Sequence, residues 1–187
     1  MAIAPSIDAD QARQLLREAE LLYPATAVEA ALERMAQAIT TRLAGQNPLV
    51  MVVMNGGLIP AGLLLTRLDF PLQIGYLHAT RYRSGTRGGD LQWLAAPSME
   101  VEDRVVLVID DIFDEGHTLN AIVAELQRLC ARSVHIAVLV NKNHERKAPN
   151  LAVDFVGLEV PDRYVFGYGM DCHEYWRNAR GIYALNE

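Results

Sequence analysis

Three carboxylates follow an apolar run in the middle of the chain, and they are the side chains best placed to do chemistry. Asp110 and Asp111 come directly after residues 105–109, and Asp114 follows three residues later. Carboxylates at the end of a strand can accept hydrogen bonds from vicinal sugar hydroxyls, directly or through a hydrated divalent cation. Asp114 is the candidate catalytic residue, because a third carboxylate beside them can accept a proton or stabilise positive charge.

The residues after the acid pair predict a turn that binds phosphate. Gly116 permits a tight turn, and Thr118 offers a hydroxyl and backbone N–H groups at the start of a helix predicted over residues 119–129. The N-terminus of a helix attracts anions such as phosphate. The predicted phosphate-binding loop is Asp114, Glu115, Gly116, His117 and Thr118.

The surrounding apolar segments predict the sheet that must position these residues. Residues 105–109 are all apolar without polar alternation, which is typical of a strand covered on both faces in a parallel sheet. Further strands are predicted from Leu49 for about five residues and over residues 72–82, 133–140 and 155–160, with a helix over 61–68. Strands that alternate with helices indicate a doubly wound, mainly parallel α/β sheet, whose ligands bind beyond the carboxyl ends of the strands.

The whole chain, residues 1–187, is predicted to form a single domain. Residues 1–45 are expected to hold two amphipathic helices, the second beginning with a capping box of Thr26 and Glu29. The apolar stripe of the first helix is predicted to comprise Ala12, Leu15, Leu16, Ala19 and Leu22.

Composition excludes several classes of function. A formal net charge of −6, from 17 basic and 23 acidic residues, argues against a general nucleic-acid or anionic-membrane surface. The apolar segment 49–65 is interrupted by Asn55-Gly56-Gly57 and Pro60, so it is not predicted to span a membrane. Two distant cysteines and an N-terminus without a basic start or apolar run indicate a reducing cytoplasm.

The order of strand, acid pair, third acid, Gly, Thr and helix resembles the phosphoribosyl pyrophosphate (PRPP) signature of purine phosphoribosyltransferases. The resemblance extends from about Leu49 to the carboxyl end and points to the hypoxanthine-guanine members of that family. It is closest over residues 154–171 (DFVGLEVPDRYVFGYGMD) and 174–178 (EYWRN). It implies a type I phosphoribosyltransferase fold with a small hood formed by terminal segments, in which residues 161–187 bind the purine. It also implies a homodimer or homotetramer.

The resemblance implies a role for each matched residue. Asp110 and Asp111 would bind the ribose of PRPP and, with Asp171, hold Mg²⁺, whereas Asn55, Gly56 and Arg177 would bind pyrophosphate. Lys142 would donate to the purine 6-oxo group, Tyr164 would stack on the base, and the backbone of Val165 would read its edge. An ammonium can donate to a 6-oxo group but meets another donor in the 6-amino group of adenine. Lys142 therefore favours 6-oxopurines.

Three places depart from the family pattern. Arg81-Tyr82-Arg83 stands where the family's flexible loop begins with a Ser-Tyr pair, and closure of this loop is expected to exclude water. Asn55 occupies a position that is often basic in the pyrophosphate turn. Glu115 and His117 replace the more usual Thr and Lys or Arg, so His117 is a candidate substitute for the missing cation.

The predicted reaction is purine salvage, in which hypoxanthine or guanine reacts with PRPP to give IMP or GMP and pyrophosphate. The sequence does not predict the relative preference among hypoxanthine, guanine and xanthine. One alternative is a phosphoribosyltransferase-like regulator that binds RNA, which the acidic balance disfavours. A receiver-like phosphoacceptor domain is a weaker alternative, because its acid pair is expected after the first strand of the sheet.

Overall fold

A six-stranded sheet forms the centre of the computed structural model, which describes residues 7–81 and 91–186. Its strand order is β4-β3-β2-β5-β6-β7, and every neighbouring pair is parallel except β3 with β4. The strands are β2 (Leu49–Val53), β3 (Gln73–Arg81), β4 (Leu91–Ala95), β5 (Val105–Phe113), β6 (Ser133–Lys142) and β7 (Phe155–Val160). The predicted doubly wound, mainly parallel α/β sheet is therefore confirmed.

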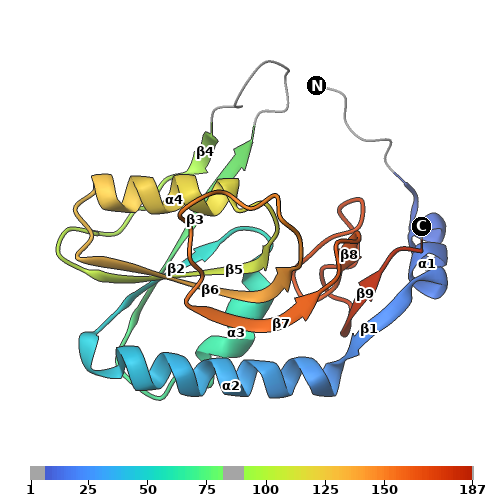
Figure 1. The fold of residues 1–187 in the computed structure, drawn as a ribbon, viewed down its shortest axis with the longest axis horizontal. Helices are drawn as coiled ribbons and strands as arrows, with labels where there is room; N and C mark the ends of the chain where they lie inside the picture. The colour runs from blue at the N-terminus through green and yellow to red at the C-terminus, as the bar shows by residue number, and fades with distance from the viewer. Residues whose placement is uncertain (1–6, 82–90, 187) are drawn as a thin grey trace.

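Helices cover both faces of this sheet (Figure 1). Helices α2 (Ala25–Leu43) and α3 (Leu58–Leu65) lie on one face, and α4 (His117–Arg128) lies on the other. Alternate side chains of a strand point to opposite faces, so Leu107 packs in the cluster with α2 and α3, whereas Val108 packs in the cluster with α4. Both are fully buried, which explains why β5 shows no polar alternation.

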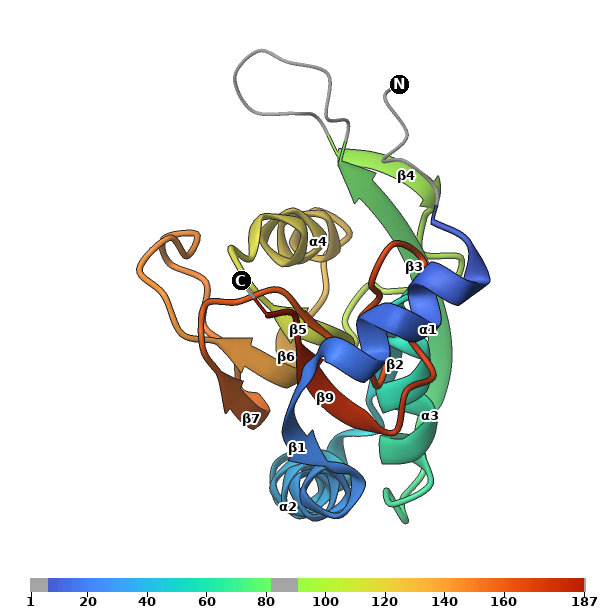
Figure 2. The ribbon, with the colours of Figure 1, turned by 90° about the vertical axis from the view of Figure 1, so that its right-hand side faces the viewer.

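The two ends of the described chain meet in a second, smaller sheet beside the carboxyl ends of the main strands (Figure 2). Its order is β1-β9-β8, from β1 (Glu20–Pro24), β8 (Val165–Phe166) and β9 (Gly181–Ala184), and its pairs are antiparallel. Helix α1 (Ala9–Glu18) precedes it and accepts a hydrogen bond at Ala12 O from Trp176 Nε1 at 2.6 Å. These terminal segments form the small hood that the family resemblance implies.

The N-terminal segment differs in detail from the prediction. The capping box of Thr26 and Glu29 is wrong, because α2 begins at Ala25 after Pro24 and has no side-chain cap. Leu22 lies in β1 and not in the first helix, which ends at Glu18. A capping box does occur one helix earlier, where the Asp8 side chain accepts from the N–H groups of Asp10 and Gln11. A short 3-10 turn, η1 (Ala44–Gln46), ends this region.

No helix within residues 7–81 and 91–186 is both long enough and apolar enough to cross a membrane.

Strand β4, which the sequence did not predict, pairs with the carboxyl end of β3 and is the edge strand of the sheet. This edge carries large exposed apolar side chains at Ile74, Tyr76 and Leu94.

Candidate active site

A cleft of about 410 Å³ opens at the carboxyl ends of β2 and β5, beneath the C-terminal hood. The main sheet, the loop before α4 and the hood all contribute to it. The sequence-predicted residues that line this cleft are Asn55, Gly56, Asp110, Asp111, Asp114, Gly116, Thr118 and Arg177. The lining residues do not include Glu115 or His117, nor the predicted purine residues Lys142, Tyr164 and Val165.

Asp110 and Asp111 lie within β5, which continues beyond the apolar run to Phe113. Asp111 is 8% exposed, and its backbone N–H donates to Asp110 Oδ1 at 2.9 Å. Burial raises the pKa of both carboxyl groups, and the neighbouring Asp111 carboxylate raises the pKa of Asp110 further. The positive charge of Arg177 opposes both shifts. Asp111 is buried and Asp110 is partly buried, and two neighbouring carboxylates form an oxygen donor set that suits a divalent cation.

The turn after β2 packs against this acid pair with no side chain between them. A Cβ atom at Gly56 would lie 2.1 Å from Asp111 Oδ2, so only glycine fits there. Gly169 in the C-terminal segment has φ +114, and a Cβ on it would lie 2.2 Å from Gly56 O. The predicted pyrophosphate turn is thus held between the Asp111 carboxylate and the hood backbone.

Asp114 lies where β5 and β6 end side by side. Phe113 pairs with Asn141, which places the next residues of the two strands, Asp114 and Lys142, together. Lys142 Nζ donates to Asp114 Oδ2 at 2.9 Å. His144 Nε2 lies 2.6 Å from Asp114 Oδ1. Partial burial raises the pKa of Asp114, but hydrogen bonds from Lys142 and His144 outweigh it, so the pKa lies below the usual value.

His144 is a candidate site residue that sequence reasoning missed. Its side chain is only 3% exposed, and Nδ1 accepts a hydrogen bond from the backbone N–H of Arg146 at 3.1 Å. A single histidine in a polar stretch after a strand gives a weak signal. Its one informative feature is its place two residues after Lys142, at the carboxyl edge of the sheet.

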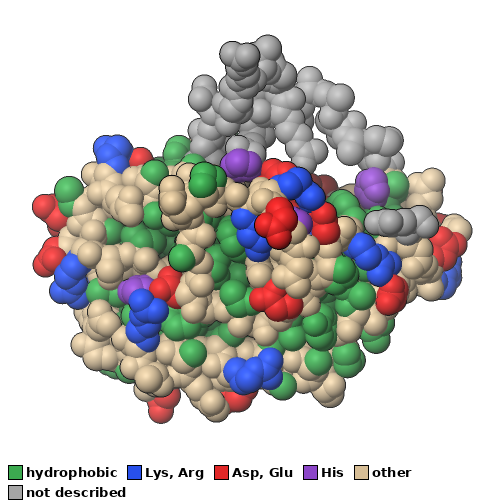
Figure 3. All heavy atoms as spheres, in the orientation of Figure 1, with side chains coloured by type: hydrophobic (Ala, Val, Ile, Leu, Met, Phe, Trp, Pro, Cys, Tyr) green, Lys and Arg blue, Asp and Glu red, His purple; other side chains and the backbone are tan. Residues whose placement is uncertain are grey.

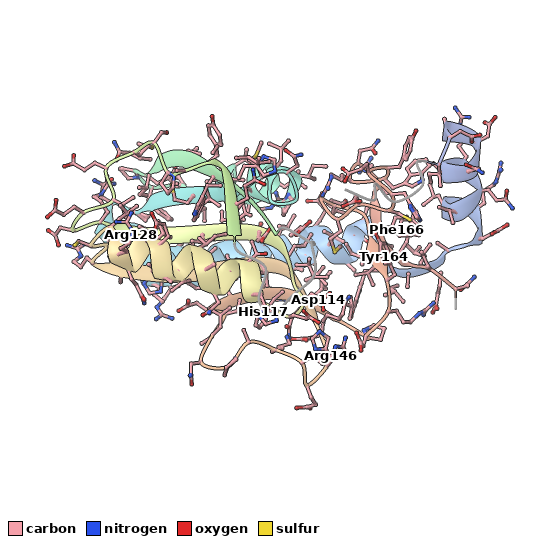
Figure 4. The ribbon with its side chains drawn as sticks, turned by 90° about the horizontal axis from the view of Figure 1, so that it is seen from above. Asp114, His117, Arg128, Arg146, Tyr164 and Phe166 are labelled. Atoms are coloured by element: carbon pink, nitrogen blue, oxygen red, sulfur yellow. The ribbon has the colours of Figure 1, made fainter. Side chains whose placement is uncertain are left out.

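The loop before α4 has the turn geometry expected for anion binding. Gly116 has φ +79, and a Cβ there would lie 2.2 Å from Phe113 Cε2, so the turn requires glycine. Helix α4 begins at His117, and Figure 4 shows His117 at that end of the helix, near Asp114 and Arg146. His117 Nε2 lies 3.5 Å from a Glu115 carboxylate oxygen, and both side chains are almost half exposed.

The C-terminal residues predicted to contact the purine and the metal lie in the hood segment. Tyr164 is 51% exposed and Val165 is buried in β8. Partial burial and then the Asp171 charge raise the pKa of Tyr164. Asp171 Oδ1 lies 2.7 Å from Arg177 Nη2, and Asp171 Oδ2 accepts from Glu174 N–H at 2.9 Å. Both oxygens of Asp171 therefore already have partners.

Among the described residues, the ligand atoms of Asp114, His144 and Asp162 lie within 4.8 Å of one another, an arrangement that could hold a metal ion. Two cations already contact this group: Lys142 binds Asp114, and Arg146 forms two hydrogen bonds to Asp162 at 2.8 and 2.9 Å. The Asp110–Asp111 pair is less well neutralised. It is therefore the stronger candidate for a cation.

The predicted flexible loop falls mostly outside the described residues. The backbone of Arg81 ends β3, and Tyr82 and Arg83 lie in the segment that the structure does not describe.

Comparisons with known proteins agree on the family. Residues 18–174 match the phosphoribosyl transferase domain. A hypoxanthine-guanine phosphoribosyltransferase of Staphylococcus epidermidis is 36% identical over 150 residues, which cover 79% of this chain and 83% of that protein. The bifunctional protein TilS/HprT of Listeria monocytogenes is 34% identical over 155 residues, or 82% of this chain, but the match spans only 24% of that longer protein.

A solved structure gives the same result for the fold. A crystal structure of a hypoxanthine phosphoribosyltransferase from Staphylococcus aureus superposes with a TM-score of 0.84 at 29% identity and covers 96% of each chain. The family match covers most of the chain, including β5, its acid pair and the loop before α4. This chain belongs to the phosphoribosyltransferase family.

Proposed function

We propose that the chain is a 6-oxopurine phosphoribosyltransferase that transfers the 5-phosphoribosyl group of PRPP to hypoxanthine or guanine. The products would be IMP or GMP and pyrophosphate. The observation that carries this proposal is the contact between Asp114 and Lys142 at 2.9 Å. It puts a proton acceptor beside a cation that can donate to a 6-oxo group, at the mouth of a cleft lined by two further carboxylates.

The charges in the cleft suggest which residues bind which part of PRPP. Asp110 and Asp111 accept hydrogen bonds from the ribose hydroxyls. The backbone N–H groups at the start of α4, with the Thr118 hydroxyl, bind the 5′-phosphate. Arg177 and the turn at Asn55 and Gly56 bind the pyrophosphate, whose departure leaves an electron-poor ribose carbon.

Asp114 then accepts a proton from the purine as a purine nitrogen bonds to the ribose carbon. Lys142 donates to the 6-oxo group, Tyr164 stacks on the ring, and the backbone of Val165 reads the edge of the base. The 6-amino group of adenine would bring a donor against the Lys142 ammonium, so adenine is a poor substrate.

We also propose Mg²⁺ as the cofactor. Asp110 and Asp111 would hold it, with Asp171 as a third ligand once it exchanges its contacts with Arg177 and Glu174. The bound ion supplies positive charge that offsets the charge of the pyrophosphate leaving group. The raised pKa values of Asp110 and Asp111 support this assignment, because burial and, for Asp110, the neighbouring Asp111 carboxylate disfavour the charged forms, which a bound cation would stabilise.

The chain is further proposed to form a homodimer or homotetramer in the cytoplasm. The exposed apolar side chains of Ile74, Tyr76 and Leu94 on β3 and β4 support self-association. Both cysteines, Cys130 and Cys172, are free thiols, as expected in a reducing compartment. Figure 3 shows Lys and Arg side chains scattered among acidic ones on the face it displays, which gives no support to an RNA-binding regulator.

The experiment is an assay of the purified full chain with PRPP, Mg²⁺ and each of hypoxanthine, guanine, xanthine and adenine. We expect IMP and GMP formation that stops after exhaustive chelation and returns on adding Mg²⁺. A chain that used neither hypoxanthine nor guanine would overturn the proposed function. Full activity after chelation would overturn the cofactor assignment alone.

A further inference from the structure

We propose that His144 is a positioning residue that holds Asp114 by one carboxylate oxygen and leaves the other to receive the purine proton. The inference rests on the proposed function, in which Asp114 manages that proton. It begins from the two oxygens of Asp114, which contact different residues. Lys142 Nζ donates to Oδ2 at 2.9 Å, and His144 Nε2 contacts Oδ1 at 2.6 Å.

The backbone selects the tautomer of the His144 ring. Nδ1 accepts from the N–H of Arg146 at 3.1 Å, so this nitrogen carries a lone pair and no proton. The proton of the neutral ring must then be on Nε2, which donates it to Asp114 Oδ1. A side chain that is only 3% exposed leaves little access for water to compete with this hydrogen bond.

The segment that carries His144 is tied down on two sides. Arg146 forms two hydrogen bonds to Asp162, at 2.8 and 2.9 Å, in the segment that leads to the purine residues. Ala148 N–H donates to Glu115 O at 2.7 Å, in the loop before α4. These contacts fix the backbone from which the imidazole reaches Asp114, and a fixed second partner is what orients a catalytic carboxylate.

Substrate binding should affect Lys142 and His144, the two partners of Asp114, differently. Lys142 is also needed at the 6-oxo group of the base, so the three donors of its ammonium group are shared between Oδ2 and the purine once the base enters. His144 has no such second task and keeps its contact with Oδ1. Oδ2, on the side of the group that binds the base, is therefore the oxygen with a lone pair for the purine proton, while Oδ1 keeps the carboxylate in place.

Two amide variants of His144 separate these contacts. In His144→Gln the side-chain amide reaches about as far as Nε2 and can still donate to Asp114. In His144→Asn the amide reaches only about as far as Nδ1, so it can contact the Arg146 backbone but not Asp114. Glu145→Gln, at an exposed neighbouring position, is a control for changes in the segment itself.

We expect His144→Asn to lower kcat by about tenfold with little change in KM for PRPP, the effect of losing one hydrogen bond to a charged catalytic group. His144→Gln should recover most of kcat. The acid limb of kcat should lie at higher pH in the Asn variant than in the Gln variant, because the ionised form of Asp114 loses a donor. Neither amide titrates. The charged groups around Asp114 are the same in both variants: Lys142, Arg146, Lys147, Glu115 and Asp162.

Equal kcat values and equal acid limbs for the Asn and Gln variants would overturn the role of His144. A readout independent of turnover is the imidazole nitrogen chemical shifts of His144, measured by NMR and assigned with the Gln variant. They should report a neutral ring with its proton on Nε2, and a proton on Nδ1 would also overturn the inference. An inactive wild type that shows the expected tautomer would contradict the proposed function and leave the geometry of His144 intact.

Discussion

In the metal-free protein, the Asp110–Asp111 pair should lower the free energy of unfolding. Asp111→Asn should therefore make the protein more stable. The Asp111 side chain is 8% exposed, and burial raises the pKa of both Asp111 and Asp110. Asparagine has nearly the same shape and can still fit against Gly56, but it removes one charge of the pair. We therefore expect a more stable protein that has lost part of its ability to bind PRPP.

The size of the effect follows from the charges involved. Two adjacent carboxylates in a partly buried site repel each other by roughly 3–4 kcal/mol at an effective dielectric constant of about 20. The positive charge of Arg177 offsets part of this repulsion. A net gain of about 1–2 kcal/mol remains for Asp111→Asn, which corresponds to a rise in Tm of about 2–8 °C for a chain of this length.

The direction of the stability change in Asp111→Asn can be checked by varying pH. Well below the ordinary aspartate pKa of about 4, the carboxyl group is protonated in both folded and unfolded chains, so it causes no difference in stability. As pH rises through the raised folded-state pKa, the folded protein must carry a charge that burial disfavours, and the wild type loses stability. The gain from Asp111→Asn should therefore be small in acid and grow toward neutral pH.

Thermal unfolding in buffer with a chelator, measured across this pH range, tests the reasoning. Asp154→Asn is a control of opposite sign, because Asp154 is paired with Arg42 and accepts from Ile136 N–H, so its loss should lower Tm. A Tm for Asp111→Asn at or below that of the wild type near neutral pH would refute the argument. Adding Mg²⁺ should narrow the gap by stabilising the wild type.

Three further substitutions test the proposed chemistry. Asp114→Asn should lower kcat by roughly ten- to a thousandfold while sparing PRPP binding, and an unchanged kcat would remove Asp114 from the proton-handling role. Lys142→Ala should weaken hypoxanthine and guanine use together in steady-state assays, whereas a wild type that uses adenine as well as hypoxanthine would contradict the role of Lys142. His117→Lys should raise PRPP affinity, because it puts a permanent cation where the 5′-phosphate is proposed to bind. Identical binding profiles would leave the backbone of α4 as the sole phosphate ligand, in keeping with the contact of His117 with Glu115.

The main sheet could be predicted because its strands are locally distinct. Residues 105–109 are all apolar and residues 155–160 are mostly so; the first run begins β5, which continues to Phe113, and the second forms β7 at the expected place. The meeting of the acid pair with the phosphate loop follows from the same logic, since both lie at the carboxyl end of one strand. Lys142 joins them because a neighbouring parallel strand ends at the same edge.

The hood and His144 could not be predicted in the same way. Strands β1, β8 and β9 have two to five residues each, and they are stabilised by pairing between the two ends of the chain, which no local pattern records. Leu22 therefore fitted a helical stripe equally well until β9 provided a partner. The contact of His144 with Asp114 depends on how residues 143–150 fold back, which involves Arg146, Asp162 and Glu115 from three separate segments.

The junction of Gly56 with Gly169 bears on how inhibitors of this chain could lose potency. At this point the cleft is walled by main chain on one side and by the Asp111 carboxylate on the other, and an added Cβ at either glycine would overlap its neighbours. A compound that draws its affinity from this wall would contact atoms that no single side-chain replacement can reshape without also disturbing Asp111. Resistance by substitution should arise instead at exposed side chains such as Tyr164, which is half exposed and can be replaced without moving the main chain.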